Sequence, residues 1–168
     1  NDGGAPLAAA ADDGVELHAG PERSVAATKT YTAQLTVMAM LAAALGHQPE
    51  RAAELARLPE ALAATLAGAS GAQALAEQYR ATELWALVAR GYNFATALEL
   101  GLKLKELTYV GTSAYSSADF RHGPIATVSA GTPVVLVMPA GAAFADMAEL
   151  AGQLKARGAQ LLVISDAP

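Results

Sequence analysis

The sequence predicts an α/β fold in which a parallel sheet lies between two layers of helices, a three-layer sandwich of the Rossmann or flavodoxin type. The first observation is a pair of apolar runs rich in β-branched residues, "TPVVLVMPAG" at 132–141 and "AQLLVIS" at 159–165, which are typical of buried strands. The second is the stretch between them, 142–158, which has helical periodicity and ends on a glycine. Strand, helix and strand in this order form a βαβ unit, and such units build parallel sheets covered by helices.

The first part of the chain predicts mostly helices. A short strand is expected at 15–18, before the turn "AGPE". The helical spacing of leucine and methionine predicts a long helix over 24–45, and Gly46 is suited to end it. Pro49 fits the first turn of a second helix over 50–67, where its missing N–H costs no hydrogen bond.

A third helix, capped by Ser70, is expected to run to about Arg80. The pattern then changes to "ELWALVARG" at 83–91, a short apolar run that predicts a further buried strand, followed by a helix over 94–109. Parallel sheets bind their ligands at the carboxyl ends of the strands. In this chain those ends are predicted at Arg90–Gly91, Pro139–Ala140 and Ser165–Asp166.

Composition and charge limit what the chain can bind. Of its 168 residues, 53% are hydrophobic and 16% are charged, which excludes an intrinsically disordered chain. The net charge is −5 and no basic stripe is present, so we expect neither nucleic acid nor a membrane as a partner. No uninterrupted apolar run in the sequence approaches the ~20 residues that span a bilayer.

The chain has no cysteine, which excludes disulfides, thiolate catalysis and cysteine-bound zinc and is compatible with a reducing cytoplasm, where we expect the protein to act. The histidines His18, His47 and His122 do not share the spacing of metal ligands, so we expect no metal and no other cofactor. The chain opens on Asn1 with no strand or helix before it, and we expect that an N-terminal segment is missing from it.

Two stretches carry side chains suited to proton transfer. In the helix over 94–109, Glu99, Lys103 and Glu106 are spaced i, i+4 and i+7 and therefore lie on one stripe. This spacing fits an exposed ladder of ion pairs as well as a catalytic row. His122 stands before a Gly-Pro turn in "VGTSAYSSADFRHGP", a position that fits a turn residue as well as a catalytic one.

Two long motifs, "AGPERSVAATKTYTAQLTVMAMLAAAL" and "RGYNFATALELGLKLKELTYVGTSAYSSADFRHGPIA", cover much of the chain. They resemble, in the same order, motifs of the sugar isomerase (SIS) domain family. Within the family the resemblance is greatest to glucosamine-6-phosphate deaminases of the sugar-isomerase type and to the isomerase half of glucosamine-6-phosphate synthases. It implies the C-terminal part of a first SIS domain at 1–47, connecting helices at 48–81, and a second SIS domain at 82–168 that is incomplete at its C-terminus.

The resemblance also implies roles for individual residues. Glu106 matches the glutamate that moves a proton between C1 and C2 of an open-chain sugar phosphate, and Lys103 matches the lysine that supports the charge of the intermediate. His122 matches a histidine that opens the sugar ring and comes from the neighbouring subunit, which implies a homodimer. The backbone around Val25 and Ala27 matches a segment that contacts the sugar. The phosphate-binding loop of the family would lie before the first residue.

The resemblance favours an amino-sugar phosphate isomerase or deaminase. Ala27 and Ser113 stand where the synthases have serine and glutamate, and "SSADFRHGP" is closer to the deaminase pattern. The expected reaction releases ammonia from a substrate such as glucosamine 6-phosphate through an enediol or enolamine. One alternative is the isomerase part of a glutamine–fructose-6-phosphate aminotransferase. Another is a non-catalytic module that binds a sugar phosphate in order to regulate a partner.

Overall fold

A computed structural model describes residues 4–167 and divides the chain into two compact units, Asn1–Glu77 and Gln78–Pro168. The first unit is helical and the second contains the sheet. The elements up to the boundary are α1 (Pro6–Ala9), α2 (Lys29–Leu45), α3 (Pro49–Leu55), α4 (Leu58–Gly68), the 3-10 helix η1 (Ala69–Gly71) and α5 (Ala72–Gln78). Those that follow are β1 (Leu84–Ala89), α6 (Asn93–Thr108), β2 (Gly111–Ser116), α7 (Ser117–Arg121), the 3-10 helix η2 (Pro124–Thr127), β3 (Pro133–Val137), α8 (Phe144–Ala156) and β4 (Gln160–Ile164). Within residues 4–167, no helix combines the length and apolar character needed to cross a membrane.

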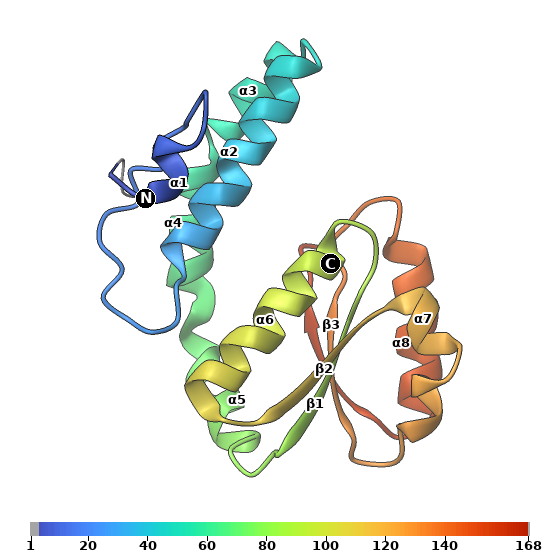
Figure 1. Ribbon diagram of the computed structural model, residues 1–168. Helices are drawn as coiled ribbons and strands as arrows, with labels where there is room; N and C mark the ends of the chain where they lie inside the picture. The colour runs from blue at the N-terminus through green and yellow to red at the C-terminus, as the bar shows by residue number, and fades with distance from the viewer. Residues whose placement is uncertain (1–3, 168) are drawn as a thin grey trace. The chain divides into compact units, whose positions relative to one another are not determined.

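The second unit confirms the predicted α/β class. Its sheet has the strand order β2-β1-β3-β4, and every pair of neighbouring strands is parallel. Successive side chains of a strand point to opposite faces, so the side chains of β1 pack in two separate cores, one on each face of the sheet. On one face Leu87 and Ala89 pack with Ala97 of α6, and on the other face Val88 packs with Phe120 of α7 and with α8. Figure 1 shows the result, with α6 on one side of the sheet and α7 and α8 on the other.

The apolar runs and amphipathic stretches of the second unit form the elements predicted for them. Residues 83–91, 132–141 and 159–165 contain β1, β3 and β4, and the helices predicted over 94–109 and 142–158 are α6 and α8. These segments were predictable because strands buried on both faces need continuous apolar sequence, and the two helices each bury one face.

Strand β2 was not predicted from the sequence. Its residues, "GTSAYS", are small or carry hydroxyl groups, and they lack the β-branched apolar run of a central strand. β2 lies at the edge of the sheet and pairs only with β1, so its residues stay at least partly exposed and need little apolar surface. The register places Ala89 opposite Ser116, so that β1 and β2 end at the same edge of the sheet.

Two predictions for the start of the first unit are wrong. Residues 15–18 form no strand, since no strand lies within residues 4–77 to pair with them. The helix predicted from residue 24 begins at Lys29, because the preceding loop folds back and its Glu22 carboxylate accepts a hydrogen bond from the backbone N–H of Thr30 in the first turn.

The single helix predicted over 50–67 is two helices, α3 and α4. Pro59 is the second residue of α4. A proline at that position cannot continue a helix from α3, because it has no N–H to donate and its ring meets the carbonyl group four residues earlier. The third predicted helix likewise begins as η1 and ends at Gln78, two residues before the predicted end.

Helix α6 approaches the sheet closely at Gly101. A Cβ atom at this position would be 2.9 Å from Leu87 Cδ1 and 3.0 Å from Thr112 Oγ1. The Thr112 hydroxyl donates a 3.1 Å hydrogen bond to the carbonyl oxygen of Gly101. These contacts fix which face of α6 is buried and therefore the direction in which its charged side chains project.

Candidate active site

The buried face of α6 leaves its charged row on the side of the helix away from the sheet. Ala97 and Gly101 are the buried residues of the helix. Glu99, Lys103 and Glu106 project in other directions, and their side chains remain 22%, 18% and 29% exposed. The row is therefore mostly covered, and each of its three side chains keeps some exposure to solvent.

Lys103 binds both carboxylates of the row. Its Nζ donates a 2.7 Å hydrogen bond to Glu106 Oε2 and lies 3.4 Å from Glu99 Oε1. The hydrogen bond to Glu106 raises the pKa of Lys103 above its usual value, burial opposes this, and the charges of Glu106 and Glu99 add to the rise. The sequence fitted either a ladder of ion pairs or a catalytic row. Both alternatives have the geometry observed here, in which the ammonium group of Lys103 lies between two carboxylates.

His122 lies at the C-terminal end of α7 and is exposed. Its backbone N–H donates a 3.1 Å hydrogen bond to the carbonyl oxygen of Asp119, and Pro124 begins η2 two residues later. The imidazole therefore projects from a short connection between two helices that are each less than two turns long.

The structure does not bring His122 and Glu106 of one chain together. Glu106 belongs to α6, whose Ala97 packs in the core on one face of the sheet, whereas His122 follows α7, whose Phe120 packs in the core on the other face. Figure 1 shows the two helices on opposite sides of the strands.

The predicted sugar-contacting segment precedes α2 in the first unit. Val25 is 95% exposed, Ala27 is partly exposed, and Ala26 between them is buried. The side chains that hold this loop are those of its flanking residues: the Thr30 backbone N–H and hydroxyl donate to Glu22 Oε1 at 2.9 and 2.7 Å, and Lys29 Nζ lies 3.1 Å from Glu22 Oε2.

Glu22 was not predicted from the sequence as part of this segment. The hydrogen bonds from Thr30, together with Lys29, lower the pKa of Glu22 to about 2, so the carboxylate is ionised at neutral pH. An acidic residue shortly before a predicted helix is the signal that could have found it, because carboxylates favour helix N-termini. The spacing of eight residues between Glu22 and Thr30 gave no such indication.

A second group that was not predicted holds α7 against α8. Arg121 donates two 2.7 Å hydrogen bonds to Asp146, from NH1 to the carboxylate oxygen Oδ1 and from NH2 to the backbone carbonyl oxygen. The buried Ser117 hydroxyl donates to Asp146 Oδ2 at 2.6 Å. The hydrogen bond from Ser117 lowers the pKa of Asp146 below its ordinary value, burial opposes this, and the hydrogen bond from Arg121 to the carboxylate and the positive charge of Arg121 lower it further.

The carboxyl ends of β3 and β4 are bound to each other. Asp166 Oδ1 accepts a 2.6 Å hydrogen bond from the backbone N–H of Ala140, and the Ser165 hydroxyl donates a 2.9 Å bond to the carbonyl oxygen of Met138. The backbone N–H of Ala140 at this edge therefore already binds a carboxylate of the same chain.

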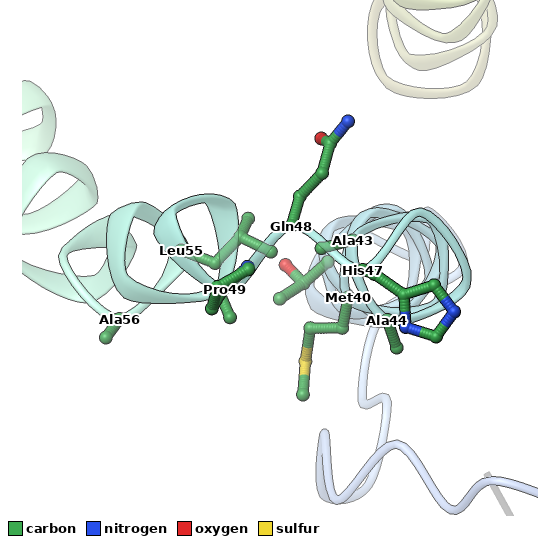
Figure 2. A pocket seen from close by; sticks show the side chains of 10 residues that line it. Met40, Ala43, Ala44, His47, Gln48, Pro49, Leu55 and Ala56 are labelled. Carbon is green, nitrogen blue, oxygen red and sulfur yellow. The ribbon is translucent and has the colours of Figure 1, made fainter.

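A groove of about 690 Å³ lies in the first unit, between α2 and α3. Figure 2 shows Met40, Pro49 and Leu55 around it, with His47 at its margin. None of the five residues predicted for the site lines this groove. In the part of the chain that the structure describes, no three histidine, aspartate or glutamate side chains gather closely enough to hold a metal ion.

Comparison with known proteins gives one family match. A sequence model of the SIS domain matches residues 85–168, the part that contains the sheet, α6 and α7. Among curated proteins, the isomerizing glutamine–fructose-6-phosphate aminotransferase of Thermococcus kodakarensis is 39% identical over 165 residues, covering 93% of this chain and 27% of that protein. The chain thus spans about a quarter of the length of that relative.

Two solved structures extend the comparison. A protein provisionally described as a phosphosugar isomerase, from Silicibacter pomeroyi, has a TM-score of 0.87 and 36% identity over 97% of this chain and 49% of its own. The glucosamine-6-phosphate deaminase of Thermotoga maritima has a TM-score of 0.68 and 22% identity over 88% of this chain and 45% of its own, a likeness that shows the fold alone. The chain spans about half the length of each.

Proposed function

This chain belongs to the SIS domain family, and from that premise we propose that it carries the proton-transfer residues of a sugar-phosphate isomerase. The observation that supports the proposal most is the 2.7 Å contact between Lys103 and Glu106 on α6, where a carboxylate and an ammonium group meet and stay partly open to solvent. A carboxylate beside a fixed positive charge suits the removal of a proton next to a carbonyl group, because the charge stabilises the anion that forms.

In the proposed reaction Glu106 takes a proton from C1 or C2 of an open-chain sugar phosphate. The electron pair moves toward the neighbouring carbonyl or imine group and gives an enediol, or an enolamine when C2 carries nitrogen. The carbonyl oxygen gains a proton as the enediol forms, Glu106 returns its proton to the other carbon, and the neighbouring hydroxyl group loses a proton as it becomes the new carbonyl group. Aldose and ketose are thus interconverted with no net change in the enzyme. A positioned base of this kind contributes ~10²–10⁴-fold to the rate.

Lys103 supplies the balancing charge in this scheme. Its raised pKa keeps the ammonium group protonated at neutral pH, and its two carboxylate neighbours hold it in one place. A cation held before the reaction starts needs little reorganisation when negative charge develops on the substrate oxygens.

We assign His122 to ring opening in the active site of a neighbouring subunit. Its exposed side chain and its position across the sheet from α6 both support this assignment, since the imidazole is free to enter another chain's site but is remote from its own Glu106. The active unit is then a homodimer with two composite sites.

The first unit supplies substrate contacts in the same proposal. The backbone around Val25 and Ala27 contacts the sugar, and residues 1–47 belong to a first SIS domain. Residues 48–81 connect it to the second domain at 82–168. The exposure of Val25 and the hydrogen bonds that hold the loop between Glu22 and Thr30 support a role as a rigid contact surface.

Two reactions share this proton transfer. In a deaminase, proton transfer from C2 to C1 of glucosamine 6-phosphate leaves an imine at C2, and water replaces the nitrogen as ammonia leaves. Ala27 and the "SSADFRHGP" motif favour this reaction. In an aminotransferase the nitrogen is instead added to fructose 6-phosphate from glutamine, which the name of the 39% identical relative favours. We place ammonia release first.

The test measures ammonia and fructose 6-phosphate formed from glucosamine 6-phosphate by the full-length protein, without glutamine. Glu106→Gln is expected to lower kcat by at least ~10²-fold, because the amide cannot accept the proton. Glu149→Gln, at an exposed carboxylate on α8, is the matched control and is expected to leave kcat unchanged. Formation of glucosamine 6-phosphate from fructose 6-phosphate and glutamine, with no release of ammonia from glucosamine 6-phosphate, favours the aminotransferase. Binding of the sugar phosphate without any turnover favours the regulatory module, and full activity of Glu106→Gln excludes the proposed base.

A further inference from the structure

We propose that Asp146 is a positioning residue for His122: it holds both ends of α7 against α8, and so fixes the connection from which the imidazole projects. The inference rests on the proposed function, because it concerns His122 as a residue that acts on the substrate. It extends that function to a residue which lies on another helix and does not itself touch the substrate.

One residue of α8 binds the first and the last residue of α7. Ser117, which begins α7, donates to Asp146 Oδ2 at 2.6 Å, and Arg121, which ends it, donates to Oδ1 and to the backbone carbonyl oxygen at 2.7 Å each. Figure 1 shows α7 and α8 together on the same side of the sheet. The paired bonds from one guanidinium group fix its orientation as well as its position.

Helix α7 needs such support because it has only five residues. A helix this short is unstable alone, since the cost of nucleation exceeds the gain from its few hydrogen bonds. Phe120 anchors its middle in the core, where it is 1% exposed, and Ser117 is fully buried. Asp146 supplies the polar anchor at both ends, and the end that carries Arg121 adjoins His122.

The charge of Asp146 matters more than its shape. Its carboxylate accepts from a hydroxyl group and a guanidinium group at once, and Arg90 adds a further positive charge nearby. Asparagine has the same size but no charge: its oxygen can accept from Arg121 and its NH2 group can donate to the Ser117 hydroxyl oxygen, so what it loses is the ion pair with Arg121. Asp146→Asn therefore weakens the attachment of Arg121, the end of α7 that adjoins His122, without creating a cavity.

The experiment is a double-mutant cycle in the full-length protein, with glucosamine 6-phosphate as the substrate. Asp146→Asn is made with His122 present and again in a His122→Asn background. If Asp146 acts through His122, kcat falls about 10-fold in the first case and less than about 2-fold in the second, because a misplaced imidazole matters only where an imidazole exists. A rise in KM with kcat unchanged, or an equal fall of kcat in both backgrounds, overturns the inference.

Two further variants keep the test decisive. Arg121→Lys keeps the positive charge but cannot form the paired bonds, and the same background-dependent loss is expected from it even if Asp146→Asn fails to fold. Glu149→Gln on α8 is the matched control, and a loss from Asp146→Asn no larger than the control's also overturns the inference. A His122→Asn protein with unchanged turnover contradicts the proposed function itself, whereas a slow His122→Asn protein with additive losses contradicts the positioning role alone.

Discussion

Lys103 and Glu106 form a 2.7 Å ion pair one turn apart on α6, and the side chain of each is less than one-third exposed. Glu99 reaches the same ammonium group at 3.4 Å from the preceding turn. The geometry places one cation and two anions in a row that faces away from the sheet. The role of each of these three side chains can therefore be tested separately, since each can be substituted without changing the hydrophobic core.

Removal of the cation is expected to slow the reaction. Lys103→Met in the full-length protein should lower kcat by ~10²-fold or more, because the developing negative charge on the substrate loses its fixed partner. Lys105→Met is the matched control, since this lysine lies on the same helix, is exposed and is outside the row. Steady-state kinetics with glucosamine 6-phosphate give the comparison. An equal loss from both variants would show that general charge, and not the row, matters.

The same ion pair predicts how stability changes at alkaline pH. The pKa of folded Lys103 is raised above its ordinary value of 10.5, so the ammonium group stabilises the folded state fully below that pH. The stabilisation is lost as pH rises through the folded pKa. The urea midpoint of the unmodified protein should therefore fall more steeply above pH 10.5 than that of Lys103→Met. Parallel curves would contradict the role of the pair in the folded state.

Glu22 predicts the opposite behaviour at acidic pH. Its folded pKa of about 2 lies below its ordinary value of 4.5, so its contribution is present above pH 4.5 and is lost as pH falls through 2. Hydrogen exchange in the first turn of α2 should accelerate over that range, and Glu22→Gln should exchange fast already at neutral pH. Glu16→Gln, an exposed carboxylate whose contact to His18 is 3.8 Å, is the control and should behave like the unmodified protein.

Two glycines inside helices are expected to respond in opposite ways to alanine. A Cβ atom added at Gly152 of α8 would have no atom within 4 Å apart from those of its chain neighbours and the backbone of its own helix, so Gly152→Ala should stabilise the protein by about 0.5–1 kcal/mol through helix propensity. At Gly101 the added Cβ would lie 2.9 Å from Leu87 Cδ1, and overpacking costs about 1–3 kcal/mol, which exceeds the gain. Gly101→Ala should lower the urea midpoint and also kcat, because α6 carries Glu106. A stabilising Gly101→Ala would mean that the helix can shift without loss.

The central strands were predictable from the sequence and the edge strand was not, and the difference is physical. β1 and β3 are buried on both faces and so must be apolar throughout, whereas β2 pairs on one side only and can be built from serine, threonine and glycine. The break between α3 and α4 could have been predicted, since Pro59 was visible in the sequence. Its position in an otherwise continuous alanine-rich pattern concealed it.

The contacts of the candidate site were likewise predictable from the sequence only in part. The row of Glu99, Lys103 and Glu106 follows from helical spacing alone, so the contacts of Lys103 with both carboxylates could be anticipated. The contacts around Asp146 could not, because Ser117 and Arg121 are separated from it by 29 and 25 residues and meet it only when α7 packs on α8. Tertiary contacts between charged residues on separate elements leave no periodic pattern in a sequence.

The assignment of His122 to a neighbouring subunit predicts that two inactive proteins restore each other. In a homodimer of either variant, Glu106→Gln or His122→Asn, both composite sites carry the substitution and are inactive. In a mixed dimer, one composite site receives both substituted residues and the other receives neither. If subunits mix at random, half of the dimers are mixed and each has one intact site, so activity should recover to about a quarter of the unmodified value. The two proteins are unfolded and refolded together, with each refolded alone as the control. If His122 and Glu106 instead act within one chain, no dimer contains an intact site, and activity stays at the level of the separate variants.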